Sequence, residues 1–85
     1  MEIYRTGRFK KDFKGLPSNV QEQAAKTLEM FLANSRYPAL RIKKMEGAPG
    51  IWEMRVSDNY RITFQFVDEG ILLRRIGSHN ILRQA

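Results

Sequence analysis

The sequence predicts an α+β fold of two layers, in which an N-terminal strand and a helical hairpin pack on one face of an antiparallel β-meander. Two observations predict this fold. Apolar residues recur at helical spacing in the first half of the chain and alternate with polar residues in the second half. Short turn signals separate the alternating segments. The 85 residues are expected to form a single domain, because two cores do not fit in so short a chain.

The first five residues are expected to form a short strand that leads into the first helix. Phe9, Phe13 and Leu16 have the spacing of one helix face. The opposite side carries Lys10, Lys11, Asp12 and Lys14, so the apolar side is expected to face the sheet. Gly15 and Pro17 end this helix.

A second helix is the most strongly periodic segment of the chain. Ser18 and Gln21 match a capping box, in which Ser18 accepts from the first-turn amides and Gln21 bonds back to the cap. The helix is expected to end before Pro38, because proline disfavours helical angles in the preceding residue. The apolar stripe of this helix consists of Val20, Ala24, Leu28, Phe31 and Leu32.

The second half of the chain has the alternation of an antiparallel meander. Strands are expected over 51–56, 60–67 and 71–79, joined by two turns of three residues each. A further strand is possible over 40–45, and the glycines and proline of 47–50 predict a loop after it. Helices on one side leave the other face of such a sheet open to solvent.

Turn lengths predict the register. Arg55 is expected opposite Arg61, and Arg75 opposite Thr63. Arg74 then falls on the core face, where we expect it near an edge with its head in water. The core face is predicted to carry Trp52, Met54, Val56, Tyr60, Ile62, Phe64 and Phe66. The open face is predicted to carry Glu53, Arg55, Arg61, Arg75 and His79.

The charge of the chain points to an anionic partner. Fifteen Lys and Arg residues against nine Asp and Glu residues give a net charge of +6 and a pI near 10.1. Such a balance is typical of nucleic-acid or acidic-partner binding, although it also serves solubility. Two opposed arginines destabilise a sheet, which favours an anion site at Arg55 and Arg61. The alternative is that Glu53 neutralises them in a solvated network.

His79 is the candidate acid or base, because histidine is the residue type used most often for proton transfer at physiological pH and the chain has only this one. An acid or base beside phosphate-binding arginines is what phosphodiester cleavage requires. The alternative is a surface histidine at a strand end. One histidine cannot be both acid and base, so the second role falls to Glu53, Tyr60, a lysine such as Lys44, or a group outside this chain.

The composition of the chain excludes several other classes of protein and functional site. The chain has no cysteine and one histidine, which excludes disulfide scaffolds, thiol nucleophiles and clustered-histidine metal sites. No carboxylate pair has metal-binding spacing, so neither a metal nor another cofactor is expected. No apolar run is long enough for a membrane span or a signal peptide, so we expect a cytoplasmic protein.

These segments together resemble the RelE/ParE superfamily of type II toxin–antitoxin toxins. The resemblance covers nearly the whole chain in length and element order. Its most specific parts are Trp52-x-x-Arg55, Tyr60-Arg61 and Gly77-x-His79. The RelE-like branch, with its YoeB-like and YafQ-like members, consists of ribosome-dependent mRNA endonucleases. The resemblance therefore implies metal-free attack of a ribose 2′-hydroxyl on the adjacent phosphate.

The same resemblance implies roles for individual residues. Arg61 matches the arginine that contacts the scissile phosphate, Arg55 the basic position of the preceding strand, and His79 the histidine that serves as acid or base. Lys43 and Lys44 fall in the basic segment before the meander, where such enzymes contact substrate. The expected RNA-binding residues are Lys43, Lys44, Arg75 and Glu53.

Partners and alternatives follow from the same resemblance. The expected partners are the ribosome, mRNA and an antitoxin that lays an acidic helical or extended segment over the open face or the helical hairpin. A ParE-like toxin that inhibits DNA gyrase is the alternative, since it shares the fold and motifs without a catalytic histidine. A third possibility is an RNA-binding module without catalysis.

Overall fold

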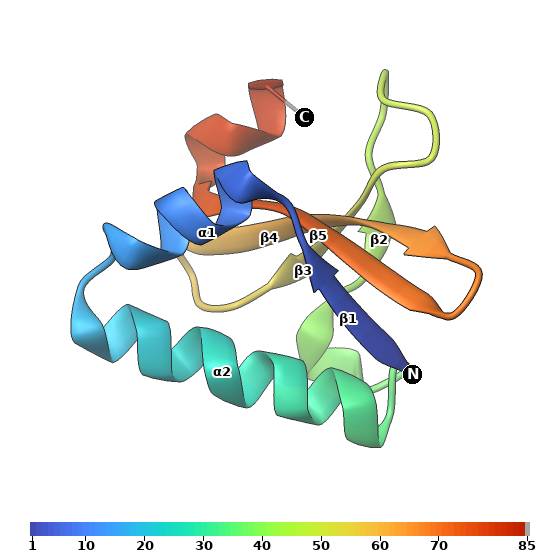
Figure 1. Cartoon of the computed structure of the whole chain (residues 1–85), viewed down its shortest axis with the longest axis horizontal. Helices are drawn as coiled ribbons and strands as arrows, with labels where there is room; N and C mark the ends of the chain where they lie inside the picture. The colour runs from blue at the N-terminus through green and yellow to red at the C-terminus, as the bar shows by residue number, and fades with distance from the viewer. Residues whose placement is uncertain (85) are drawn as a thin grey trace.

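The computed structural model describes residues 1–84, which form a mixed five-stranded sheet with a helical hairpin (Figure 1). The strand order is β1-β5-β4-β3-β2, with β1 parallel to β5 and the other neighbours antiparallel. This confirms the predicted α+β class. In the described part of the chain, no helix has the length and apolar character to cross a membrane. The elements are β1 (Glu2–Arg5), α1 (Gly7–Lys14), α2 (Ser18–Ala33), the 3-10 turn η1 (Pro38–Leu40), β2 (Lys43–Lys44), β3 (Trp52–Arg55), β4 (Tyr60–Val67), β5 (Gly70–Ser78) and the 3-10 segment η2 (His79–Gln84).

The start of α2 differs from the predicted capping box. Pro17 is the N-cap residue and Ser18 is already helical, so no side chain caps this helix. The reason lies in the short link between the helices, which places Pro17 rather than Ser18 at the boundary. The Gln21 amide donates instead to the carbonyl of Phe13, at 2.8 Å. Because Phe13 lies in the last turn of α1, this bond ties the two helices together.

The core lies between the helical hairpin and the sheet, as predicted. Met54, Ile62 and Phe64 are fully buried. Two predicted apolar contacts are wrong, because Phe66 is 50% exposed and Leu32 is 51% exposed. Phe66 packs edge to face on the half-buried Trp52, close to the hairpin end of β4. Leu32 lies twelve residues after the first stripe residue, which rotates it about 120° off the buried side of α2.

The predicted register of the meander is confirmed at the centre of the sheet and is wrong near the turn between β4 and β5. Arg55 pairs with Arg61, and Thr63 pairs with Arg75. Toward the second turn, a three-residue turn predicts Val67 opposite Ile71, whereas Val67 pairs with Gly70 because a β-bulge inserts one residue into β5. Arg74 sits at this bulge, and its Nη1 donates to the Gln65 side chain at 2.8 Å rather than reaching freely into water.

The second face of the sheet is more covered than predicted. We call it the polar face; it bears Glu53, Arg55, Arg61, Thr63 and Gly77. Figure 1 shows η2, in red, on the side of the sheet opposite α2. Ile81 of η2 is 7% exposed, and a Cβ on Gly77 would lie 2.8 Å from its Cγ2. The chain therefore turns over this face to bury Ile81, so β5 ends at Ser78 and His79 begins η2 instead of extending a strand.

Candidate functional site

Two cross-strand rows build the polar face. Glu53, Thr63 and Arg75 form one row, and Arg55, Arg61 and Gly77 form the other. Alternation along β3 and β4 places every second side chain here, which is why the rows share a face. Thr63 is fully buried, and its hydroxyl has no hydrogen-bond partner within the part of the chain that is described. The charged side chains lie around this buried centre.

Arg61 is held tightly on the polar face. Its Nη1 donates to the carbonyls of Ser57 and Tyr60, the latter at 2.9 Å. Its Nε lies 4.0 Å from the carboxylate of Glu53, and the side chain is only 14% exposed. Arg61 therefore orders the turn between β3 and β4 while its charge stays on this face.

The opposed arginines avoid repulsion by taking separate anions. Arg55 pairs with Asp58, whose side chain is 88% exposed, whereas Arg61 pairs with Glu53. Like charges directly opposite in a sheet are otherwise destabilising. Asp58 is a partner that the sequence reasoning missed. Its signal was its position in the turn, three residues after Arg55.

Glu53 is the centre of the charge cluster. It is 7% exposed and lies between two cations, with Lys43 Nζ and Arg61 Nε each 4.0 Å from its Oε1. Lys43 is 70% exposed at its side chain, so its ammonium is accessible. A groove of about 430 Å³ adjoins this cluster and is lined by Lys43, Lys44, Met45, Glu46, Glu53 and Leu82. Leu82 is a contributor from η2 that the sequence reasoning did not single out.

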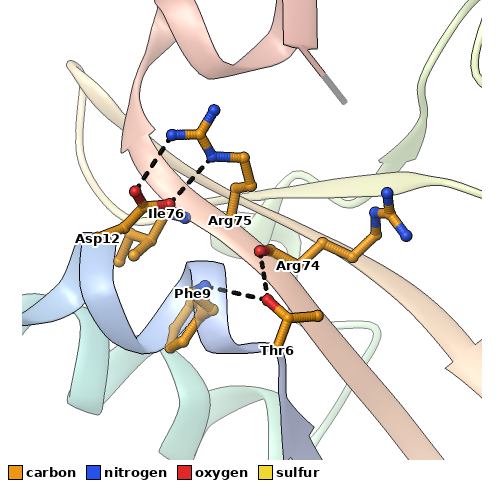
Figure 2. A network of polar contacts seen from close by, with 6 residues as sticks. All are labelled: Thr6, Phe9, Asp12, Arg74, Arg75 and Ile76. Atoms are coloured by element: carbon orange, nitrogen blue, oxygen red, sulfur yellow. Dashed lines mark hydrogen bonds and ion pairs between the residues drawn. The ribbon is translucent and has the colours of Figure 1, made fainter.

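Lys44 and Arg75 have their partners outside the cluster, although Lys44 also lines the adjoining groove. Lys44 pairs with Trp52 on the opposite face, with its Nζ 5.5 Å from the centre of the indole ring. Arg75 contacts α1 at the sheet edge, where its Nε and Nη2 each lie 3.1 Å from the carboxylate of Asp12 (Figure 2). This hydrogen bond raises the pKa of Arg75 above its usual value. Arg75 thus joins α1 to β5.

His79 lies at the end of β5 with an exposed side chain. The preceding Ser78 pairs with Tyr60, the neighbour of Arg61, so His79 follows the strand end nearest the arginine row. The structure therefore brings Lys43, Glu53, Arg55 and Arg61 together. It places His79 at the margin of this set and removes Arg75 and Lys44 from it. Among residues 1–84, no three His, Cys, Asp or Glu side chains gather as a metal-binding group.

Comparisons with known proteins identify the class of this fold and site. Residues 18–81 match the family model of the ParE-like toxin domain. The chain belongs to this family, within the RelE/ParE superfamily of type II toxin–antitoxin toxins. A search of curated protein sequences found no match.

Solved structures of toxins have the same fold. One is a chain of the intact RelBE toxin–antitoxin complex from E. coli, with 28% identity and a TM-score of 0.68 over 89% of this chain and 93% of that one. Another is a YoeB/ParE toxin from Agrobacterium tumefaciens, with 13% identity and a TM-score of 0.77 over 93% of this chain and 99% of that one. A third is YafQ from E. coli strain BL21(DE3), with 19% identity and a TM-score of 0.75 over 95% of this chain and 96% of that one.

Proposed function

We propose that this toxin is a ribosome-dependent mRNA endonuclease whose site is the polar face and its margin at His79. The observation that supports this most is the charge cluster on that face. Lys43 and Arg61 flank a buried carboxylate beside a groove, and an exposed histidine follows the adjacent strand end. Cations fixed in place before the reaction stabilise the charge that develops on a phosphate during cleavage.

The proposed reaction is attack of a ribose 2′-hydroxyl on the adjacent phosphorus. The new O2′–P bond forms as the P–O5′ bond breaks, which leaves a 2′,3′-cyclic phosphate and a free 5′-hydroxyl. His79 donates the proton that the leaving 5′-oxygen requires. The 2′-hydroxyl proton passes to a second group, for which Glu53 is the buried carboxylate that lines the groove. Arg61 and Lys43 stabilise the doubly charged phosphorane.

Arg61 is suited to stabilising the phosphorane because its fixed hydrogen bonds leave one nitrogen of its guanidinium group available. Nε and Nη1 face protein oxygens, whereas Nη2 has no partner within the described residues. A guanidinium already held in position loses little conformational entropy when it meets a phosphate. Arg55 stands beside it, and its one ion pair among the described residues is with a solvent-exposed carboxylate, which a phosphate can displace.

An antitoxin is the proposed protein partner. Similar chains occur in complexes described as RelB–RelE from Methanococcus jannaschii and DinJ–YafQ from E. coli. On this chain, an apolar groove of about 380 Å³ lies between β1, α1 and α2, and Leu32 is half exposed there. Arg5, Lys10 and Glu29 also line it, and because the two cations exceed the one carboxylate, an amphipathic segment with acidic residues fits its chemistry.

Inhibition of DNA gyrase is the second candidate function, because the matching family model is that of the ParE-like toxin domain. One pair of assays separates the two. Primer extension on an mRNA in a translating extract is expected to show discrete cuts within the translated region when the purified protein is added. A gyrase supercoiling assay at the same protein concentration is expected to show no inhibition. Intact mRNA together with inhibited supercoiling would reverse the assignment.

A further inference from the structure

A further pocket lies at the end of α2 and is lined by polar, aromatic and apolar residues. It has a volume of about 350 Å³, and none of its lining residues is part of the charge cluster. It forms where the chain leaves α2, passes through η1 and enters the edge strand β2, in the green segment of Figure 1. Its lining residues are Ser35, Arg36, Tyr37, Pro38, Arg41 and Ile42.

The charge around this pocket is uncompensated. Residues 30–45 contain four cations and no carboxylate. Arg36 and Arg41 are both exposed, and neither guanidinium has a hydrogen-bond or ion-pair partner within the part of the chain that is described. This contrasts with Arg55, Arg61 and Arg75, which all have protein partners. Two unpaired guanidinium groups at one pocket favour an anionic ligand.

The backbone of Arg41 is strained. Its φ and ψ are 47° and 48°, and it is the one non-glycine residue with positive φ among those described. Glycine or asparagine adopts this left-handed conformation more readily than arginine does. The preceding Leu40 is 1% exposed and anchors the segment in the core, which holds Arg41 in place. A strained, anchored arginine at a pocket indicates a functional use of its side chain.

Tyr37 adds an aromatic surface to the two cations. Its side chain is 48% exposed, and Pro38 restricts the backbone that carries it. Exposed aromatic rings interleaved with arginines are typical of single-stranded nucleic-acid sites, because bases stack on the ring while guanidinium groups bind the backbone. The cations continue along the chain to Lys43 and Lys44 of β2, beside the groove of the polar face.

We propose that this pocket binds one nucleotide of single-stranded RNA, with its phosphate on Arg36 and Arg41 and its base on the ring of Tyr37. The inference rests on the proposed function, because it supplies a second RNA contact outside the cleavage site. The test measures RNA binding alone. The proposed cleavage activity and the proposed nucleotide pocket can therefore be refuted independently of each other.

The test measures fluorescence anisotropy of a labelled single-stranded RNA of about 12 nucleotides, with wild-type protein and Arg41→Gly. We expect Arg41→Gly to raise Kd about fivefold and to lower the slope of log Kd against log salt by about 0.7, the value for one lost phosphate contact on a single strand. We expect its Tm to be unchanged or higher, because glycine relieves the backbone strain. Weaker binding by a protein of undiminished stability is a result that a purely structural arginine would not produce.

Two further variants test the stacking and the charge. Tyr37→Phe keeps the ring and is expected to bind RNA as the wild type does, whereas Tyr37→Ala is expected to weaken binding by about fivefold or more. Lys26→Ala removes one exposed cation from α2, outside both pockets, and is expected to change Kd less than twofold. If Arg41→Gly and Tyr37→Ala bind RNA like the wild type, the proposal is wrong. Loss of antitoxin binding with RNA affinity intact would likewise overturn it in favour of a protein contact.

Discussion

Ion pairs divide the arginines of the sheet into different roles. Arg75 pairs with Asp12, and Arg55 pairs with an exposed carboxylate. Arg61 pairs with Glu53 and donates to three backbone carbonyls. Sequence reasoning placed all three arginines on one face, because strand alternation alone assigns faces. It named Glu53 as an alternative partner for the two opposed arginines, and Glu53 does lie beside Arg61. It did not predict Asp12 or Asp58, whose contacts depend on the approach of α1 and on the shape of one turn. The sheet face that forms the candidate site was thus predictable. Which of its cations are able to bind an external anion was not.

Asp12 accepts more hydrogen bonds from the protein than an exposed carboxylate usually does. Its oxygens accept from the Arg75 side chain and, at 3.3 Å, from the backbone N–H of Ile76 (Figure 2). That N–H lies beyond the end of β1, where β5 is still paired with β4 but has no neighbouring strand on its other side. Asp12 therefore closes an unpaired stretch of sheet edge.

Replacing Asp12 by asparagine is expected to lower the free energy of unfolding by about 2 kcal/mol, because a charge-assisted bidentate contact is lost at a site only about one-seventh exposed. Urea denaturation measures this, with Asp68→Asn in an exposed turn as the control. Equal stability of the two variants would contradict the role given to Asp12.

The pH dependence of this ion pair follows from Arg75. Its folded-state pKa is raised, so its contribution is fully present below the unfolded pKa and is lost only as pH rises through the folded pKa. Both values lie above the neutral and mildly alkaline range. The Asp12→Asn effect on unfolding free energy is therefore expected to be constant between about pH 7 and pH 10.

Secondary-structure elements were largely predictable, because periodicity over many residues averages out local exceptions. The two helices and three meander strands appear where the apolar spacing predicts them. The errors arose where one residue decides the outcome. The bulge at Arg74 breaks the regular counting from the turn, and Pro17 replaces Ser18 as the helix cap. The parallel pairing of β1 with β5 leaves no periodic signal, since β1 has only four residues.

The junction of β1 with β5 requires a glycine. A Cβ on Gly70 would lie 1.8 Å from the carbonyl oxygen of Glu2, and this neighbour is backbone. Gly70→Ala is therefore expected to displace β1 and to lower the free energy of unfolding by about 3 kcal/mol. Gly7→Ala is the matched control, because its Cβ would meet no atom within 4 Å, and it is expected to leave stability equal or higher. Thermal or chemical denaturation measures the stability of both variants. Equal stability would contradict the close approach of Gly70 to the backbone of Glu2.

At the scale of the whole molecule, a net charge of +6 is spread over surfaces with different chemistry. The polar face combines cations with a buried carboxylate, the α2 end offers unpaired arginines, and the hairpin groove is apolar. The proposed function assigns RNA to the first two surfaces and an acidic antitoxin segment to the third. The fold class was predictable because it follows from pattern, whereas activity depends on a few side chains.

The central claim is that the polar face and His79 carry out RNA cleavage. The most direct test is the rate of mRNA cleavage in a translating extract, measured for wild-type protein, His79→Ala and Lys26→Ala. His79 is exposed, so its replacement is expected to leave Tm unchanged while it lowers the cleavage rate by about 10²–10⁴-fold, the usual effect of removing a positioned acid. Lys26→Ala is expected to cleave at the wild-type rate. Wild-type cleavage by His79→Ala would contradict the account and leave His79 as an ordinary surface residue.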